Sequence, residues 1–293
     1  MRAAATRRIL AALMSEPIAL VTGATDGIGR ATALALARRG YYVIVHGRSA
    51  ERVDAACAEI SRTVKGAFVG ACVADLSLYD EVHDAAALLL ADNPHIDVLV
   101  NNAGVFLPER GTNPQGHELT LAVNHLGHFL LTHLLLPRLL AAPQGRVVNV
   151  SSMMHAAGRI DLDDLHLARG YSGRDAYASA KLANVLFTFE LARRLEASPV
   201  TVNALHPGVI ATKLLATGFG GLGGDSLAEG IRTTLHVATA PALATVTGRY
   251  FSREKEQRAA AVAYDTKLQR SFYERSAALV GVAAVDDAAR GGL

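Results

Sequence analysis

Tryptophan is absent from this sequence, and cysteine and proline are scarce, with 2 and 9 residues among 293. Two cysteines cannot build the disulfide framework of a small secreted domain. Neither charge sign dominates, because 29 lysines and arginines face 27 aspartates and glutamates. Without a basic field, nucleic acid is not expected as a partner. The chain is 51% hydrophobic, which is enough for one large core in a single domain.

Long apolar runs are missing as well. The best candidate for a membrane span, residues 119–140, is interrupted by an asparagine, three histidines, a proline and an arginine. We therefore expect no firm membrane anchor and a cytoplasmic protein. In that reducing compartment Cys57 and Cys72 are expected as buried thiols, and a disulfide between them is the alternative.

We interpret residues 1–15 as an N-terminal extension. Basic residues followed by a short apolar stretch resemble an export signal, but the apolar part is too short and Glu16-Pro17 leads directly into the first predicted strand. An interfacial helix and a natural start at Met14 are the alternatives. Residues 16–293 are expected to form one domain, since no linker composition interrupts them.

Short apolar runs alternate with alanine-rich helical stretches along the chain. Such alternation is typical of βαβ units, which build a parallel sheet with helices on both faces. The fold class expected is therefore α/β, a three-layer Rossmann fold with a doubly wound, roughly seven-stranded parallel sheet. The predicted strands are residues 18–21, 42–46, 67–74, 96–100, 146–150, 200–205 and 248–251.

A glycine-rich turn, residues 22–29 (TGATDGIG), follows the first predicted strand and precedes a helix. Its spacing Gly-x-x-x-Gly-x-Gly differs from the Gly-x-Gly-x-x-Gly fingerprint, so the interpretation depends on the strand-turn-helix context. Glycine lets backbone amides approach a pyrophosphate closely, and the helix N-terminus adds unpaired N–H donors. The turn predicts a nucleotide cofactor, and an ordinary turn is the alternative.

Tyr177 and Lys181 lie four residues apart in a predicted helix, so their side chains share one face. The ammonium can lower the pKa of the phenol, which ordinarily lies near ~10. One unit charge at about 4 Å and an effective dielectric near ~20 supplies about 4 kcal/mol. Desolvation opposes this effect, so a second positive charge such as an oxidised nicotinamide would help. Taken alone, the pair also fits a solvated surface helix.

Two further predicted strands end in polar residues, Asn101-Asn102-Ala103-Gly104 and Ser151-Ser152. Ligands bind at the carboxyl ends of strands in open parallel sheets. With these segments the sequence resembles the short-chain dehydrogenase/reductase family over nearly its whole length. The motifs follow in the family's order, which is the glycine turn, Asp75-Leu76, the Asn-Asn-Ala-Gly strand end, Asn124, the serine pair, Tyr177-x-x-x-Lys181 and His206-Pro207-Gly208.

Within that family the sequence looks most like the retinol dehydrogenase and WW-domain oxidoreductase branch. The likeness is carried by residues 124–132, 148–155 and 179–184, and by the tail segments 248–251 and 272–276. The long gap between the serine pair and the tyrosine also suits this branch. This gap implies an inserted loop, residues 158–174, near the mouth of the substrate site.

The resemblance implies NAD(P)-dependent interconversion of a carbonyl and an alcohol. Tyr177 would donate the proton, and Ser152, rather than Ser151, would hydrogen-bond the same oxygen. Lys181 would hold the nicotinamide ribose, and Asn124 would keep a water in a proton relay behind it. The expected cofactor-binding residues are Gly23, Thr25, Asp26, Gly27, Ile28, Gly29, Arg48, Asp75, Leu76, Asn102, Ala103, Gly104, Tyr177, Lys181, Pro207, Gly208, Ile210 and Thr212.

The end of the second predicted strand favours NADP(H) over NAD(H). An acidic residue there would accept hydrogen bonds from the adenosine ribose and repel a 2′-phosphate. This chain has Gly47 followed by Arg48, whose guanidinium can bind that phosphate. An Arg48 that points into solvent is the alternative. Asp75 is expected, by resemblance, to contact the adenine base.

Residues 207–230 are predicted to form a lid over the substrate, because residues 214–224 combine apolar side chains with many glycines. A flexible surface loop fits the same composition. The expected substrate is an apolar small-molecule aldehyde, ketone or alcohol. An NADP(H)-binding sensor or scaffold without turnover is the alternative function. Homo-oligomerisation through helices near residues 115–140 and 176–196 stays open.

Five histidines raise the question of other chemistry. No carboxylate or cysteine joins His125, His128 and His133 at ligand spacing, so helix packing is expected there and no metal. His155 and His206 suggest a relay to a serine nucleophile, as in a hydrolase. The Gly-x-Ser-x-Gly elbow of such enzymes is absent, which argues against that function.

Overall fold

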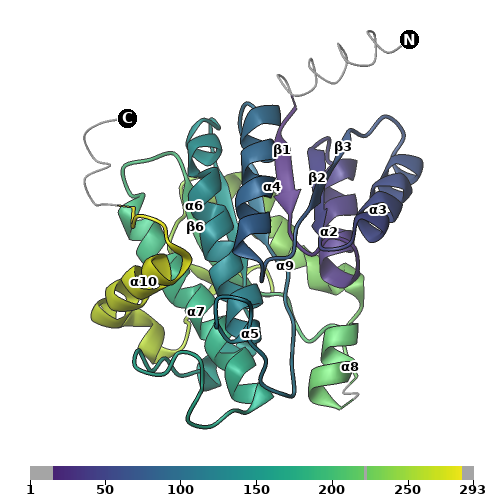
Figure 1. Ribbon diagram of the computed structural model, residues 1–293. Coiled ribbons are helices and arrows are strands. Elements are labelled where there is room, and N and C mark those ends of the chain that lie inside the picture. The colour runs from purple at the N-terminus through teal and green to yellow at the C-terminus, as the bar shows by residue number, and fades with distance from the viewer. Residues whose placement is uncertain (1–15, 221–222, 286–293) are drawn as a thin grey trace.

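Eight strands form one sheet in the order β3-β2-β1-β4-β5-β6-β7-β8. The computed structural model describes residues 16–220 and 223–285, and the predicted extension 1–15 lies outside them (Figure 1). Seven strands run parallel, so the predicted three-layer Rossmann fold is confirmed. The eighth strand, β8, pairs antiparallel with β7. It was not predicted because its three polar residues are exposed and lack apolar alternation.

The elements follow the predicted alternation with small shifts of their ends. The strands are β1 (Ile18–Val21), β2 (Tyr42–Gly47), β3 (Val69–Val73), β4 (Val98–Asn101), β5 (Arg146–Val150), β6 (Thr201–His206), β7 (Tyr250–Ser252) and β8 (Lys255–Gln257). The α-helices are α2 (Gly27–Arg38), α3 (Ala50–Thr63), α4 (Tyr79–Asp92), α5 (Leu119–Leu121), α6 (Gly127–Leu140), α7 (Gly173–Arg194), α8 (Lys213–Phe219), α9 (Leu227–Thr239) and α10 (Thr266–Val280). Shorter helical turns are η1 (Ala122–Leu126), η2 (Met153–Ala157), η3 (Pro241–Leu243) and η4 (Ala261–Tyr264).

Alternate residues of the buried strands point to opposite faces of the sheet. In β1, Ile18 and Leu20 belong to the core cluster that includes residues of α4, α6, α7 and α10. Ala19 and Val21 belong to the cluster that includes residues of α2, α3 and α9. Figure 1 shows α4 and α6 side by side over the sheet face that is turned toward the viewer. The sheet is therefore covered by helices on both faces, as a parallel sheet requires.

The strand order changes direction between β1 and β4. The helix that follows β1 packs on one face, whereas the helices that follow β4 pack on the other. A crevice is expected outside the carboxyl ends of the strands at such a switch point. The glycine turn follows β1 and the Asn-Asn-Ala-Gly segment follows β4, so both lie at this position.

The helical stretch Leu119–Leu140 is, within the described residues, the one that is long and apolar enough to cross a membrane. Its apolar window is 78% buried inside the protein, which is typical of a core helix. Helix α10 covers part of it, because Tyr273 hydrogen-bonds His133 at 2.6 Å and Ser276 hydrogen-bonds His125 at 3.0 Å. The chain's own α10 thus occupies part of the surface considered for self-association.

Cys57 and Cys72 are both free thiols, so the disulfide alternative is wrong. Cys72 is buried in β3, and Cys57 lies partly buried on α3 with its thiol directed at the carbonyl of Gly70 at 3.5 Å. Burial raises the pKa of both thiols, so neither is a reactive thiolate near neutral pH.

Candidate active site

A cavity of about 560 Å³ opens at the carboxyl ends of β4, β5 and β6, beside the start of α2. The predicted residues that line it are Asp26, Gly27, Ile28, Gly29, Asn102, Gly104, Ser152, Tyr177, Lys181, Pro207, Gly208, Ile210 and Thr212. The predicted residues outside its lining are Gly23, Thr25, Arg48, Asp75, Leu76, Ala103 and Asn124. The predicted lid, residues 207–230, also contributes Val209, Ala211, Lys213, Leu214, Leu215 and Leu227, and the predicted loop 158–174 contributes Arg174. Lining residues outside these predictions are Val150, Ser151, Met153, Met154 and His206.

The glycine turn forms a cradle at one end of the cavity. A Cβ at Gly29 would lie 2.3 Å from the carbonyl oxygen of Gly23, so only glycine fits there. Gly27 has a positive φ of +53°, and a Cβ there would meet only a Thr212 methyl at 3.5 Å. A ligand in the cavity can therefore approach the first turn of α2 at these glycines without meeting a side chain of the turn.

Nδ1 of His206 is buried without a hydrogen-bond partner among the described residues, and His206 lines the same cavity. The glycine cradle and this unpaired buried polar atom are what a dinucleotide with a polar nicotinamide end would use. The residues present therefore fit a nicotinamide cofactor.

Thr22 joins the ends of β1 and β4 beneath the cradle. Its hydroxyl oxygen accepts hydrogen bonds from the backbone N–H groups of Asn102 at 2.8 Å and Ala103 at 3.0 Å. The same hydroxyl lies 2.8 Å from Nε2 of the buried His128. Ala103 also touches the glycine turn, since a Cβ on Gly23 would lie 2.8 Å from its Cα. Thr22 was not predicted, although its place directly after a buried strand was the available signal.

Tyr177 and Ser152 are hydrogen-bonded side chain to side chain at the wall of the cavity. Ser152 follows β5, and its Oγ also accepts a hydrogen bond from the Met154 amide at 3.2 Å. Ser151 differs, because its hydroxyl donates to the carbonyl oxygen of Lys181 at 2.7 Å. Of the two serines, Ser152 is therefore the one bonded to the phenol.

Lys181 is buried beside the phenol but does not bond to it. Its Nζ donates to the carbonyl oxygen of Val150 at 2.9 Å and lies 5.6 Å from the centroid of the Tyr177 ring. Burial lowers the pKa of Lys181 to about 8. Burial also raises the pKa of Tyr177 to about 12, against a lowering by the Ser152 hydrogen bond. The expected lowering is thus not produced by the protein alone, because desolvation outweighs the hydrogen bond with Ser152.

Asn124 lies on the π-helical turn η1, an irregularity that is frequent at functional sites. Its side chain accepts from the backbone N–H of Val105 at 2.7 Å and donates to the carbonyl of Val105 at 2.9 Å. A Cβ on Gly104 would lie 3.5 Å from Oδ1 of Asn124 and 3.6 Å from Nζ of Lys181. Asn124 therefore fixes the loop after β4 close to Lys181.

Arg48 and Asp75 lie side by side at the ends of β2 and β3. The Arg48 guanidinium is 4.0 Å from the Asp75 carboxylate, and the arginine side chain is 73% exposed. Gly47 lets the glycine turn lie against β2, since a Cβ there would be 2.6 Å from the Thr25 methyl. The Leu76 side chain is buried in the core, so only its backbone is left for a cofactor contact.

Asp26 joins the predicted lid to the glycine turn. Its side chain caps the start of α2 by accepting from the backbone N–H of Gly27 at 2.8 Å. The ammonium of Lys213 on α8 lies 2.8 Å from the Asp26 carboxylate, and the Arg52 guanidinium lies 3.4 Å from it. The hydrogen bond from Lys213 keeps the pKa of Asp26 below its usual value. The Asp26 carboxylate therefore forms ion pairs with two side chains, Lys213 and Arg52.

The C-terminal part of α8 lies near the phenol. Gly218 on α8 faces Phe106, because a Cβ there would be 2.8 Å from the phenylalanine ring. The centroid of the Phe106 ring is in turn 6.0 Å from that of Tyr177. The loop predicted over residues 158–174 is held nearby, since the hydroxyl of Tyr171 donates to the carbonyl of Leu107 at 2.8 Å.

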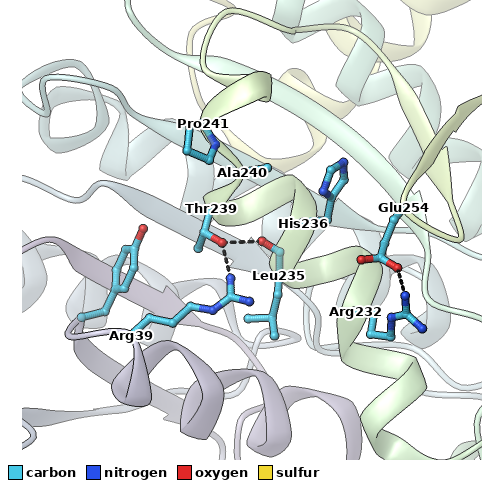
Figure 2. Close-up of a pocket in the computed structure, with 9 residues that line it drawn as sticks. Arg39, Arg232, Leu235, His236, Thr239, Ala240, Pro241 and Glu254 are labelled. Carbon is cyan, nitrogen blue, oxygen red and sulfur yellow. Dashed lines mark hydrogen bonds and ion pairs between the residues drawn. The ribbon is translucent and has the colours of Figure 1, made fainter.

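A second cavity, of about 550 Å³, runs along α9 (Figure 2). Its arginines already have partners, because Arg232 pairs with Glu254 at 2.6 Å and Arg39 donates to the Thr239 hydroxyl. None of the predicted site residues lines it. Within residues 16–220 and 223–285, no group of three metal-ligating side chains is arranged to hold a metal ion.

Comparison with known proteins relates this site to a known family. Residues 17–219 match the family model for short chain dehydrogenases. The chain is 42% identical to human retinol dehydrogenase 13 over 90% of its own length and 85% of that protein. It is 40% identical to retinol dehydrogenase 12 of Bos taurus, over 90% of this chain and 86% of that protein.

Solved structures show the same likeness. A crystal structure of a protein from Mycobacterium paratuberculosis aligns with a TM-score of 0.77 at 34% identity, covering 93% of this chain and 98% of that one. A short chain dehydrogenase from Escherichia coli complexed with NADPH aligns with a TM-score of 0.68 at 26% identity, covering 82% of this chain and 97% of that one.

Proposed function

Since this chain belongs to the short-chain dehydrogenase family, we propose that it uses NADP(H) to interconvert a carbonyl and an alcohol on an apolar small molecule. Its place in the retinol dehydrogenase branch makes it an NAD(P)-dependent oxidoreductase of such groups. The choice of cofactor and the kind of substrate are the proposal. The observation that carries the assignment of the reaction to this cavity is the hydrogen bond between Ser152 and Tyr177, at a wall that lies beside the glycine turn.

In the reducing direction Tyr177 donates its proton to the carbonyl oxygen, and Ser152 hydrogen-bonds the same oxygen. Bound NADPH supplies the hydride that the carbonyl carbon receives. The phenol is protonated at neutral pH, as a proton donor must be, and the pKa of about 12 that burial gives it has to fall for efficient proton transfer. Lys181 would hold the nicotinamide ribose, which its position beside Tyr177 supports.

Asn124 is proposed to support the return of the proton through a water behind Lys181. Both ends of its amide are bonded to Val105, in the loop that lies beside Lys181. The contribution of the Asn124 side chain is then to hold the loop after β4 at the correct distance from the ammonium. That role makes Asn124 a positioning residue.

The preference for NADP(H) is supported by Arg48, which is exposed at the end of β2. Its ionic partner among the described residues is Asp75 at 4.0 Å, a weak contact for an exposed pair. The guanidinium can turn to a 2′-phosphate at small cost, because a bidentate charge-assisted contact is stronger. A solved structure that resembles this chain is described as complexed with NADPH, which agrees with the proposal.

An apolar substrate is supported by the residues that complete the cavity. Met153 is 57% exposed and Val209 is 37% exposed, and both line it together with Leu214 and Leu215. Large apolar side chains left open at a cavity are typical of a binding site for an apolar ligand. A cytoplasmic location stays part of the proposal, supported by the burial of Leu119–Leu140 within the domain.

The test is NADPH consumption by the purified protein with apolar aldehydes and ketones, with Tyr177→Phe in parallel. Cofactor binding is followed separately for both proteins by NADPH fluorescence. We expect turnover by the wild-type protein and its loss in the variant, while NADPH still binds. Binding without turnover of any carbonyl would support the alternative, an NADP(H)-binding sensor or scaffold.

A further inference from the structure

His155 makes two hydrogen bonds whose partners fix which ring nitrogen carries the proton. Its Nδ1 lies 2.6 Å from the carbonyl oxygen of Ser152, and a carbonyl oxygen can only accept. Its Nε2 accepts a hydrogen bond from the backbone N–H of Ala260 at 3.0 Å. The imidazole is therefore the neutral form with the proton on Nδ1. Burial lowers the pKa of His155, which favours this neutral form at pH 7.

The bond from Nδ1 holds the serine that the proposed reaction uses. Ser151 is still tied to the sheet, because its backbone N–H donates to the carbonyl oxygen of Leu205 on β6 at 2.7 Å. Ser152 lies one residue farther from β5, at the start of the turn η2. Its carbonyl oxygen accepts from the backbone N–H of His155 at 3.1 Å as well as from the ring. One residue therefore holds the backbone of Ser152 through two hydrogen bonds.

The far side of the imidazole is anchored in the packed part of the fold. His155 is buried, and its ring centroid lies 4.7 Å from that of Tyr250 on β7. Ala260 lies between β8 and η4, and the preceding Ala259 is buried in the same core cluster as Tyr250. His155 and Ala260 lie outside the described lining of the main cavity. His155 thus connects Ser152 to the core from behind the cavity wall.

This arrangement differs from the serine–histidine relay of a hydrolase. In such a relay the ring nitrogen bonds the serine hydroxyl. Here the ring bonds the Ser152 carbonyl, whereas the Ser152 hydroxyl is bonded to Tyr177 and accepts from the Met154 amide at 3.2 Å. The direction of a hydroxyl depends on the backbone that carries it. The His155 bond therefore acts on the contact between Ser152 and Tyr177.

Resting on the proposed function, we propose that His155 is a positioning residue, whose Nδ1–H group holds the Ser152 backbone so that the serine hydroxyl faces Tyr177 and the substrate oxygen. Reacting groups must be held closely, and a displacement of about 1 Å can cost about 100-fold in rate. The apolar body of the substrate contacts other residues. Loss of the Nδ1–H donor should therefore lower kcat more than it changes KM.

The test uses two substitutions that each keep one of the two hydrogen bonds. The amide nitrogen of asparagine takes the place of Nδ1, so His155→Asn can still donate to Ser152. The amide oxygen of glutamine takes the place of Nε2, so His155→Gln can still accept from Ala260 but lacks the donor. Both variants lose the imidazole ring, so they differ chiefly in which hydrogen bond remains.

His133→Phe is the matched control for loss of a bridging histidine. His133 lies on α6 outside the described lining of the cavity, and its Nδ1 donates to the carbonyl of Phe129 at 2.7 Å. This variant should lose thermal stability and keep kcat. Turnover is measured with NADPH and the apolar aldehydes and ketones that test the proposed function. Amide hydrogen exchange of Met154, measured by NMR, reports on the serine turn without turnover, because its acceptor is the Ser152 hydroxyl.

We expect His155→Asn to keep kcat within about threefold of the wild-type value and His155→Gln to lose about 10- to 100-fold, with KM changed less than about threefold in both. Met154 should exchange about tenfold faster in His155→Gln than in His155→Asn. Both variants should show a lower Tm, because each loses a buried hydrogen bond. Equal losses of kcat, or none in either variant, would overturn this inference while turnover by the wild-type protein upheld the proposed function.

Two readouts decide the inference without turnover. If the wild-type protein reduced no carbonyl, the proposed function would fail. Faster exchange of Met154 in His155→Gln alone would then still show that His155 holds Ser152, and equal exchange in both variants would reject both. The second readout needs no substitution, since ¹⁵N NMR of the histidine rings identifies the protonated nitrogen in the wild-type protein. A proton on Nε2 of His155 would overturn the inference, and a proton on Nδ1 is the result expected.

Discussion

Lys181 and Tyr177 share a helical face without sharing a hydrogen bond. The Lys181 ammonium lies 5.6 Å from the centroid of the phenol ring and donates to the carbonyl oxygen of Val150 at 2.9 Å. Both side chains are buried, which disfavours the charged form of each. The phenol of Tyr177 is therefore protonated in the protein alone. A further positive charge nearby is required to lower its pKa before it can act as a base.

The first prediction concerns the titration of Tyr177. With its pKa raised to about 12, the phenol should stay protonated well above the range in which exposed tyrosines titrate. Ultraviolet difference spectra between the wild-type protein and Tyr177→Phe should show no phenolate at pH 10, and addition of NADP⁺ should bring its appearance to lower pH. Ionisation near the ordinary value without cofactor would contradict the burial argument.

The second prediction is that Lys181 lowers the free energy of unfolding of the protein, although turnover requires it. Its pKa is about 8 in the folded protein and near 10.5 when unfolded, so below pH 8 the fold bears the whole cost of a buried ammonium. Lys181→Met should raise the free energy of unfolding at pH 7 by about 1–3 kcal/mol and abolish turnover. The gain should shrink as the pH rises from 8 toward 10.5, because the wild-type lysine is then neutral in both states. Denaturant unfolding at several pH values measures this, and a gain that grows with pH would be the wrong sign.

The third prediction separates the two serines. Ser152→Ala removes the hydroxyl bonded to Tyr177 and to the Met154 amide, so it should lower kcat about 100-fold and cost about 1 kcal/mol of stability. Ser151→Ala removes the hydrogen bond to the Lys181 carbonyl and should cost about 1 kcal/mol of stability with a smaller effect on kcat. Kinetics and urea unfolding of both variants make the comparison. The reverse pattern would exchange the roles of the serines.

The fourth prediction tests Arg48 as the contact for the 2′-phosphate. Arg48→Ser should raise the KM for NADPH about 10- to 100-fold and leave the KM for NADH almost unchanged. Arg62→Ser is a suitable control, because Arg62 lies in the last turn of α3. Equal effects of Arg48→Ser on both cofactors would mean that this guanidinium does not read the phosphate.

The fifth prediction concerns the ion pair that links α8, in the predicted lid, to the glycine turn. The Lys213 side chain is 87% exposed, so its ion pair with Asp26 should contribute roughly 0.2–1 kcal/mol. Lys213→Ala should therefore speed NADPH release only about two- to fivefold, and the difference should vanish at high salt. Stopped-flow fluorescence measures the release. A difference that persists at high salt would show that the lysine acts in another way.

Local patterns in the sequence predicted most of the fold. Buried strands such as Ile18–Val21 are continuous apolar runs, and their order along the chain fixes a parallel sheet. The edge strand Lys255–Gln257 could not be predicted in this way, because it is polar and exists only through pairing with β7. Its formation depends on a tertiary neighbour rather than on its own composition.

The motifs in the sequence predicted which side chains the fold brings together. Ser152, Tyr177 and Lys181 line one cavity, although the prediction placed the ammonium close enough to lower the phenol's pKa. The actual balance depends on depth of burial, which no spacing encodes. The role of Thr22 within the predicted turn was missed for a related reason, since only the folded chain brings its hydroxyl to the end of β4.

Transfer of deuterium from NADPD, labelled at the hydride position, to an apolar aldehyde tests the central claim most directly. We predict that the wild-type protein forms an alcohol with one deuterium on the former carbonyl carbon, detected by mass spectrometry, and that Tyr177→Phe forms almost none. Tight binding of NADPH with no labelled alcohol from any aldehyde or ketone tried would contradict the account and point to a sensor or scaffold.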